Sequence, residues 1–159
     1  MTRPVVPTRI YEPDQVLDEN ELATWLSGQP VVVKPAVSAG AYKTARYDCW
    51  NEAAIEHAAE LQAEEAVMIQ PYYANIEKHG ERSLIFVDGH YSHAVRRHLP
   101  LIEGPEVDYL MEPVSASPAE LEAARQILAY LPFEDLLYAR VDLIPDRQGE
   151  PRLLELELI

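Results

Sequence analysis

The sequence predicts an α+β fold with antiparallel sheets, and the order of its predicted elements is the main reason. A strand, a loop, a helix and a second strand come first, and a hairpin, a helix and a second hairpin follow. A doubly wound parallel sheet needs helices that alternate with strands along the whole chain, whereas hairpins pair antiparallel strands. The 159 residues correspond to about one domain and are enough to bury a sizeable core.

The composition is that of a globular chain with an excess of acid. Hydrophobic residues make up 48% of the chain and charged residues 25%, which argues against wholesale disorder. The net charge of −14 argues against a nucleic-acid surface and against a polybasic membrane anchor. No apolar run approaches the roughly 20 residues of a membrane span, and the N-terminus lacks the apolar stretch of a signal peptide. A single cysteine, Cys49, excludes an internal disulfide framework, so we expect a cytoplasmic protein.

The first half of the chain predicts an extended lead-in followed by two helices and two short strands. Leu22, Trp25 and Leu26 give the first helix its apolar side, and Gly28 is the residue expected to end it. The second helix has apolar residues at helical spacing, and each strand is a short β-branched run bounded by proline. The predicted segments are the lead-in 1–13, a helix over 18–27, a strand over 30–35, a small-residue loop over 36–44, a helix over 51–65 and a strand over 67–70.

The second half predicts a hairpin, a helix and a second hairpin. Asp88-Gly89 is the strongest two-residue turn signal, and Ser117 with Glu120 matches a capping box at a helix start. The predicted segments are strands over 83–87 and 90–96, an irregular stretch over 99–115, a helix over 117–130, and strands over 138–145 and 152–159.

The last hairpin is expected to place three carboxylates on one face of a sheet. Strand side chains alternate between faces, so burying the leucines of both strands together allows only one parity of register. The leucines of the last strand expected to point inward are Leu154, Leu156 and Leu158. The opposite face then carries Arg140, Asp142, Glu155 and Glu157. With a loop over 146–151, Pro145 pairs with Arg152 and Asp142 lies opposite Glu155.

These carboxylates suggest a metal site. Like charges directly opposite one another destabilise a sheet, and a divalent cation would remove that penalty. Magnesium takes hard oxygen ligands and commonly uses one or two carboxylates together with substrate phosphates. The alternative is a solvated sheet face on which Arg140 is the only neutralising group, and the spacing alone leaves both interpretations open.

Lys34 indicates an anion near the end of the first predicted strand. A buried, unpaired lysine is costly, so this side chain is expected to reach an anion from the strand end. The small residues after it would let backbone N–H groups approach a phosphate, although neither Gly-x-x-x-x-Gly-Lys-Ser/Thr nor Gly-x-Gly-x-x-Gly is present. A surface lysine before an ordinary turn is the alternative. Combined with carboxylates suited to magnesium, a nucleotide phosphate becomes a reasonable hypothesis.

Four segments, taken in order, resemble the ATP-grasp superfamily, and specifically its glutathione-synthetase- and RimK-like ligases. The branch that looks most similar includes a cycloserine-forming ligase, which does not define the substrate. The segments are residues 32–40, residues 68–72, residues 80–86 with 92–97, and residues 138–143 with 154–157.

The resemblance implies two α+β lobes with antiparallel sheet and a nucleotide between them, with lobe one at about residues 8–70 and lobe two at about 71–159. It also implies ATP and Mg2+ as cofactors, and a ligase that joins a carboxylate to an amine or thiol through an acyl phosphate. The nucleotide-binding positions implied are Lys34, Ser38, Gly40, Lys43, Gln70, Pro71 and Tyr72. The catalytic positions implied are Arg97, with Arg96 as its alternative, and Arg140; the metal positions are Asp142, Glu155 and Glu157. Glu157 stands where many members of the superfamily have asparagine.

Three hypotheses about function follow. Relatives usually carry a further domain before these lobes and continue past the metal-binding strand, so we expect an incomplete ATP-binding portion of a ligase. Its expected partners are ATP and a small carboxylate or amine substrate, with no nucleic acid and no membrane, while a homo-oligomer or a partner domain stays open. The second hypothesis is a noncatalytic nucleotide-binding fragment or regulatory module. The third is an acidic interaction domain without nucleotide.

Overall fold

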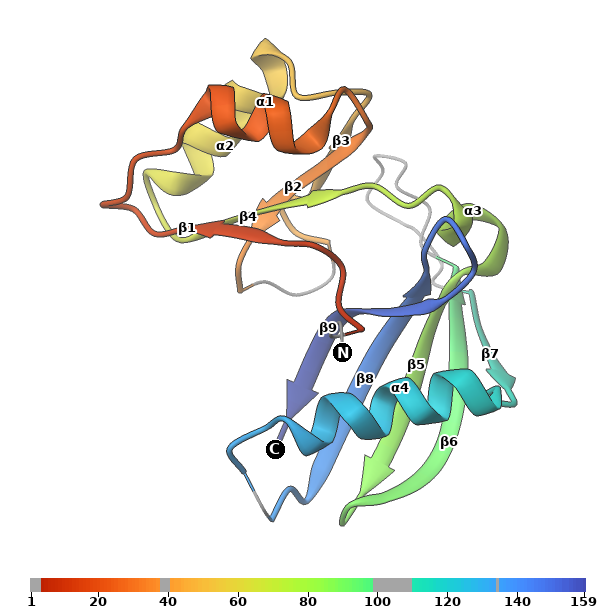
Figure 1. Cartoon of the computed structure of the whole chain (residues 1–159). Helices are drawn as coiled ribbons and strands as arrows, with labels where there is room; N and C mark the ends of the chain where they lie inside the picture. The colour runs from red at the N-terminus through yellow and green to blue at the C-terminus, as the bar shows by residue number, and fades with distance from the viewer. Residues whose placement is uncertain (1–3, 38–40, 99–109, 134) are drawn as a thin grey trace. The chain divides into compact units, whose positions relative to one another are not determined.

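The computed structural model describes residues 4–37, 41–98, 110–133 and 135–159, and the chain forms two compact units (Figure 1). The smaller unit is Pro7–Tyr72, and the larger unit is Met1–Val6 with Tyr73–Ile159. Each unit contains one antiparallel sheet with helical cover, so the predicted α+β class with antiparallel pairing is confirmed. None of the helices in the described ranges is long and apolar enough to cross a membrane.

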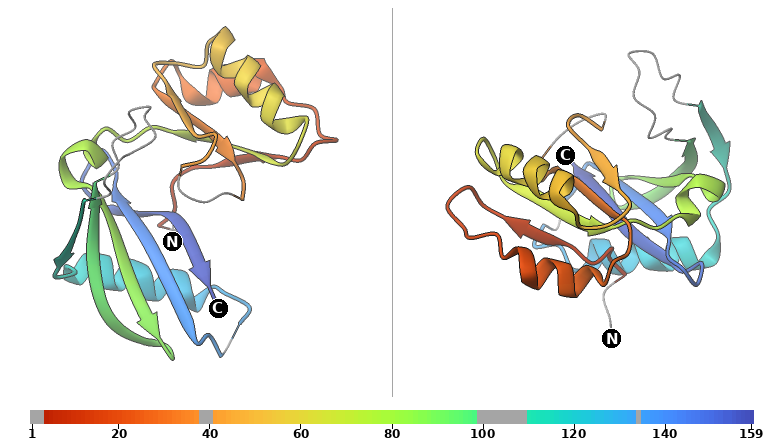
Figure 2. Two further views of the ribbon diagram at one scale, coloured as in Figure 1. Left: turned by 180° about the vertical axis from the view of Figure 1, so that it is seen from behind. Right: turned by 90° about the horizontal axis from the view of Figure 1, so that it is seen from above.

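The smaller unit is a four-stranded sheet whose strand order is β1-β4-β2-β3, with two helices packed on one face (Figures 1 and 2). Its elements are β1 Arg9–Tyr11, α1 Glu19–Leu26, β2 Val31–Pro35, β3 Ala45–Tyr47, α2 Glu52–Gln62 and β4 Val67–Pro71. Asp18 caps α1, because its side chain accepts hydrogen bonds from the N–H groups of Asn20 and Glu21 at 3.0 and 2.9 Å. The helix ends at Leu26, and its C-cap Ser27, with φ 50°, takes the left-handed conformation one residue before the Gly28 that was expected to end the helix.

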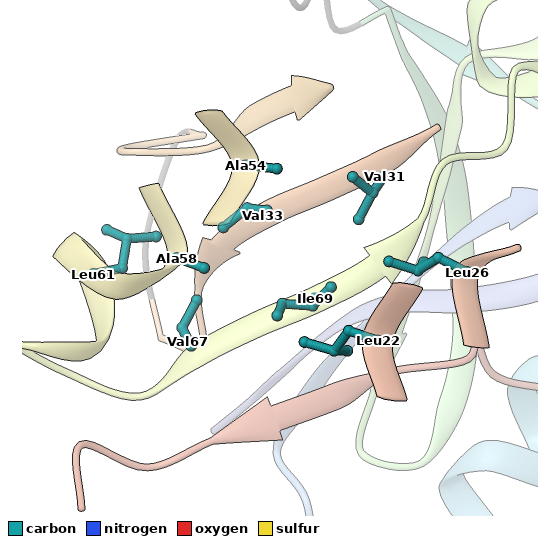
Figure 3. Packing of buried hydrophobic residues seen from close by; sticks show 9 residues of the cluster. All are labelled: Leu22, Leu26, Val31, Val33, Ala54, Ala58, Leu61, Val67 and Ile69. Atoms are coloured by element: carbon teal, nitrogen blue, oxygen red, sulfur yellow. The ribbon is translucent and has the colours of Figure 1, made fainter. Parts of the chain in front are cut away.

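The core of the smaller unit lies between the two helices and the sheet (Figure 3). Burial of each large aliphatic side chain stabilises the unit by roughly 1.5–3 kcal/mol, and the alanines allow α2 to approach the sheet closely. The core residues are Leu22 and Leu26 of α1, Ala54, Ala58 and Leu61 of α2, Val31 and Val33 of β2, and Val67 and Ile69 of β4.

The larger unit is a five-stranded antiparallel sheet whose order is β7-β6-β5-β8-β9. Its elements are α3 Asn75–His79, β5 Glu81–Val87, β6 His90–His98, β7 Leu110–Val114, α4 Pro118–Ala129, β8 Tyr138–Pro145 and β9 Pro151–Leu158. The predicted capping box of α4 is present, with Ser117 and Glu120 each bonding the other's backbone N–H. Helix α4 runs along one face of this sheet and closes the core of the unit on that side (Figure 2). The opposite face of the sheet carries the polar residues described below.

Four short elements were not predicted from the sequence. They are β1, which lies in the expected lead-in, β3, α3, and β7, which lies in the stretch 99–115 that we expected to be irregular. Each has only three to five residues, which is too few for a hydrophobic period to be recognised, and the three strands depend on partners distant in sequence.

The register of the last hairpin was predicted correctly at the carboxylates and incorrectly at the turn. Asp142 pairs with Glu155 as expected, but Pro145 pairs with Pro151 instead of Arg152. The loop is one residue shorter than expected, and a β-bulge between the Asp142 and Leu143 pairs compensates for the difference. As a consequence Leu153 packs against the core with Leu156 and Leu158, where we expected Leu154.

Candidate functional site

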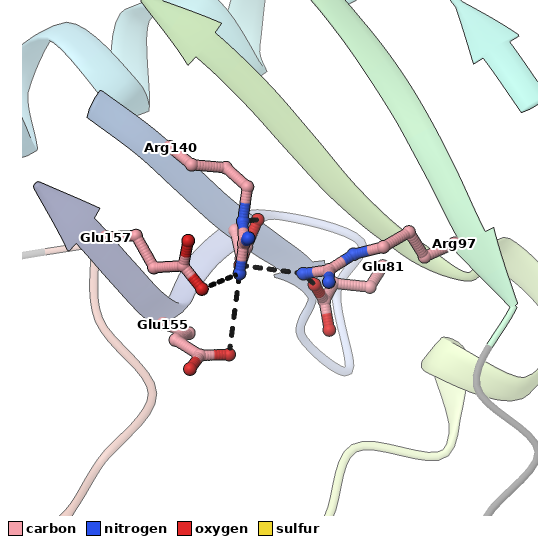
Figure 4. A network of polar contacts seen from close by, with 6 residues as sticks. Glu81, Arg97, Arg140, Glu155 and Glu157 are labelled. Carbon is pink, nitrogen blue, oxygen red and sulfur yellow. Dashed lines mark hydrogen bonds and ion pairs between the residues drawn. The ribbon is translucent and has the colours of Figure 1, made fainter. Parts of the chain in front are cut away.

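The candidate site is a network of six charged side chains on the sheet face opposite α4 (Figure 4). The face follows from strand alternation, because the intervening Leu84, Val141 and Leu156 point into the core below α4. Four adjacent strands contribute the charged residues: Glu81 from β5, Arg97 from β6, Arg140 and Asp142 from β8, and Glu155 and Glu157 from β9.

Asp142 lies at the centre of this network and is fully buried. Arg140 Nε donates to both carboxylate oxygens at 3.0 and 2.9 Å, and Arg140 Nη2 lies 2.8 Å from Oδ2. Arg97 Nη2 donates to the same Oδ2 at 2.8 Å. Two guanidinium groups therefore compensate a carboxylate whose burial would otherwise be very unfavourable.

Glu81 is a second buried carboxylate, and its exposed fraction is 2%. It lies directly opposite Arg97 in the β5–β6 ladder and forms an ion pair with it. Burial, together with the negative charge of Asp142, raises the pKa of Glu81 to about 7, although Arg97 acts in the opposite direction. The group is therefore close to its titration point at neutral pH.

Arg140 connects the buried and the exposed parts of the network. Besides Asp142, its Nη2 lies 2.7 Å from a carboxylate oxygen of Glu157 and 4.0 Å from one of Glu155. Burial alone would lower the pKa of Arg140, but the hydrogen bonds that it donates to Asp142 and the nearby negative charges outweigh burial and raise the pKa above its ordinary value. The guanidinium thus stays charged and acts as the common counter-ion of three carboxylates.

The donor set of this face suits a hard divalent cation. Four carboxylates face two guanidinium groups, so the network has a formal charge of −2 when all its groups are ionised. Carboxylate oxygens are the ligands magnesium prefers, and the cross-strand pair of Asp142 and Glu155 brings two of them together. Within the described ranges, no group of three or more His, Cys, Asp or Glu side chains is arranged so that it could hold a metal ion. In this arrangement Arg140 lies within ion-pair distance of all three predicted metal ligands, Asp142, Glu155 and Glu157.

Two adjacent arginines were left as alternatives by the sequence, and the structure separates them. The hairpin turn pairs Val87 with His90, and a bulge between the Ile85 and Phe86 pairs shifts the ladder by one residue. Arg97 therefore enters the network, whereas Arg96 forms an ion pair with Glu112 of β7.

Glu81 is the network residue that sequence reasoning missed. The available signal was its position in the hairpin. Glu81 comes two residues before Ser83, so both side chains lie on the same face of β5, and it lies opposite a basic residue of β6. The hairpin turn alone would have paired it with Arg96, so the bulge had to be known before its partner could be named.

The predicted nucleotide-binding residues lie in the smaller unit. Lys34 is half-buried near the end of β2 and pairs with Met68 in the ladder with β4. Gln70 and Pro71 end β4, and the Gln70 side chain donates to Thr8 Oγ1 at 2.9 Å. Tyr72, the last residue of this unit, donates its N–H to the carbonyl of Pro30 at 2.8 Å.

The predicted loop contacts have different outcomes. Lys43 forms an ion pair with Glu64, which follows the C-terminal end of α2, and the φ of Lys43 is 51°. Ser38 and Gly40 lie outside the described residues. The phosphate contacts of these three residues stay predictions.

Comparisons with known proteins identify similar chains. The sequence is 32% identical over 171 residues to the cycloserine biosynthesis protein DcsG of Streptomyces lavendulae. The aligned region covers 98% of this chain and 56% of that protein. The crystal structure of D-cycloserine synthetase DcsG matches with a TM-score of 0.84 at 30% identity, over 98% of this chain and 57% of that one. No family model matches the sequence.

Two more distant structures share the fold. The D-alanine–D-alanine ligase of Bacillus anthracis complexed with ATP has a TM-score of 0.67 at 19% identity, over 97% of this chain and 49% of that one. The ATP-grasp ligase PsnB complexed with its minimal precursor, Mg and ADP has a TM-score of 0.62 at 15% identity, over 97% and 44%. The chain thus spans little more than half the length of DcsG, and less of these two.

Proposed function

The chain belongs to the ATP-grasp superfamily, and we propose that it is the nucleotide- and magnesium-binding portion of an ATP-dependent ligase that forms a carbon–nitrogen bond. In this proposal ATP transfers its terminal phosphoryl group to a small carboxylate and leaves as ADP. An amine then attacks the resulting acyl phosphate and displaces inorganic phosphate. The charged network of the larger unit is the observation that carries the proposal, because it unites three candidate metal ligands with two arginines on one sheet face. A cytoplasmic location stays a prediction from the sequence.

The roles within the network follow from its charges. Asp142, Glu155 and Glu157 are the residues proposed to hold magnesium, which would neutralise phosphate charge during transfer. Arg140 and Arg97 are proposed to stabilise the transferred phosphoryl group, because guanidinium groups bind phosphate oxygens through paired, charge-assisted hydrogen bonds. Both arginines are held by Asp142, so this carboxylate also orients the groups that would meet the nucleotide.

The smaller unit is proposed to bind the nucleotide itself. Lys34 would contact phosphate oxygens from the end of β2, and the segment of Gln70, Pro71 and Tyr72 would present backbone groups to the base. The pairing of β4 with β1 ends at Ile69, directly before this segment, so β1 does not pair with the segment itself. Lys43, Ser38 and Gly40 are proposed as loop contacts to the phosphates.

Calorimetric titration with ATP and Mg2+ tests the proposal on this chain. We expect binding by the wild type and a loss of at least tenfold in affinity for Asp142→Asn, which keeps the shape of the side chain but removes a ligand charge. Glu122→Gln on the exposed side of α4 is the matched control and should bind like the wild type. Absence of heat at millimolar ATP and Mg2+ would contradict nucleotide binding and favour an acidic interaction domain.

A second assay separates a ligase from a noncatalytic module. Phosphate release should require both a carboxylate and an amine, with D-alanine and the substrates of a cycloserine-forming enzyme as first probes. Binding of ATP and Mg2+ without any such release would favour the noncatalytic nucleotide-binding module.

A further inference from the structure

Ser83 of β5 is a buried polar residue that the proposed roles leave unexplained. Its side chain is fully buried, and its Oγ has no hydrogen-bond partner among the described residues. Burying a hydroxyl group without a partner is unfavourable, and alanine at the same position would avoid this penalty. A hydroxyl that has no partner among the described side chains is available to donate to a neighbouring group.

The register places Ser83 beside the centre of the charged network. Ser83 pairs directly with Asp142 in the β5–β8 ladder, and Asp142 pairs directly with Glu155 in the β8–β9 ladder. The neighbouring Leu84 points into the core below α4, so the Ser83 side chain lies on the opposite face, which carries the network. Side chains directly opposite in antiparallel strands are close enough to interact.

Asp142 has room for one more donor. Arg97 Nη2 and Arg140 Nη2 each lie 2.8 Å from Oδ2, whereas Oδ1 receives a hydrogen bond, among the described residues, from Arg140 Nε alone, at 3.0 Å. An ionised carboxylate has about four acceptor sites, so Oδ1 can accept a hydrogen bond from a further donor.

We propose that Ser83 is a positioning residue for Asp142, and that its hydroxyl donates to this carboxylate when Asp142 takes up a divalent cation. This inference rests on the proposed function of Asp142 as a metal ligand. A carboxylate that ligates a metal is usually held by further hydrogen bonds, and losing such a bond typically weakens metal binding by 10- to 100-fold. Ser83 supplies this bond from a rigid, central strand of the sheet.

Binding of Mn2+, followed by the electron paramagnetic resonance signal of the free ion, tests this role. Mn2+ shares the preference of magnesium for carboxylate oxygens and is observed directly. Ser83→Ala should bind Mn2+ about tenfold more weakly than the wild type. Ser83→Thr, which keeps the hydroxyl and suits a strand, should restore most of the affinity. Ser115→Ala removes an exposed hydroxyl from the same unit and should leave the affinity unchanged.

Stability without metal provides the second readout. Because the hydroxyl has no partner among the described side chains, the urea midpoint of Ser83→Ala should equal or exceed that of the wild type when EDTA is present. A wild type that binds Mn2+ and a Ser83→Ala variant that binds it equally well would overturn the role of Ser83 and leave the metal site standing. A parallel loss of stability and affinity in Ser83→Ala would likewise overturn it, in favour of a structural role. A wild type without Mn2+ binding would overturn both this inference and the proposed metal site.

Discussion

Glu81→Gln is expected to change how stability depends on pH. A carboxylate whose pKa is raised in the folded state keeps its proton to a higher pH when the chain is folded than when it is unfolded. Stability attributed to Glu81 is therefore fully present below its ordinary pKa of 4.5 and is lost as the pH rises towards about 7. The glutamine variant lacks this titration because it is neutral throughout.

The magnitude follows from the size of the shift. Each unit of pKa difference corresponds to about 1.4 kcal/mol, so a rise from 4.5 to about 7 predicts that the stability of the wild type relative to Glu81→Gln falls by roughly 3 kcal/mol. The decrease should be confined to the interval between these two values. Taking the difference between variant and wild type removes the titration of other groups. One of these is Asp146, whose burial is outweighed by Arg152 and two backbone N–H groups that lower its pKa.

The assay must report on the larger unit. Both tryptophans, Trp25 and Trp50, lie in the smaller unit, so their fluorescence follows only that unit. Urea denaturation is followed between about pH 4.5 and 8 with EDTA present. Far-ultraviolet circular dichroism reports on both units and tryptophan emission on the smaller unit alone, so a shift in the first without a shift in the second belongs to the larger unit. Glu122→Gln controls for the loss of one negative charge. If the stability of the wild type relative to Glu81→Gln stays constant across the pH range, or rises with pH, the argument from burial is refuted.

Three further variants test the packing that supports the site. Gly80→Ala should destabilise the larger unit by roughly 1–3 kcal/mol, because Gly80 has φ 68° and a Cβ there would lie 2.8 Å from the carbonyl oxygen of Arg97; circular dichroism should change while tryptophan emission does not. Leu26→Ala should destabilise the smaller unit by about 2–5 kcal/mol, because Leu26 is fully buried, and tryptophan emission should show the earlier transition. Ser117→Ala should cost about 1 kcal/mol through the loss of the α4 cap, and Ser117→Asp should restore most of it; equal midpoints for all three proteins would contradict a role in capping.

The strongest sequence signals depended on local physics. Helices α1, α2 and α4 were predictable because their apolar residues recur at helical spacing and polar caps precede them. The β5–β6 hairpin was predictable because Asp88-Gly89 suits the tight turn between its strands. Short strands such as β1 and β3 carry no such signal, since their pairing is decided by residues far away in the chain.

The candidate site likewise contains residues that local sequence patterns predict and residues that depend on long-range pairing. The sequence alone determined that Arg140, Asp142, Glu155 and Glu157 share a face, because strand alternation and the burial of leucines leave only one parity. It did not determine that Arg97 belongs with them, nor that Glu81 and Ser83 lie beside them on the same face.

Two β-bulges determine which residues lie opposite one another at the site, and both bulges depend on tertiary packing. Without the first bulge the turn register would place His93 opposite Leu84 on the core face; with it, Ala94 takes that place and Arg97 lies opposite Glu81. The second bulge places Leu153 opposite Leu143 in the core while Glu155 stays opposite Asp142. An extra residue in a strand is accommodated wherever it best buries apolar side chains against α4, and this can be decided only after the helix and all five strands have come together.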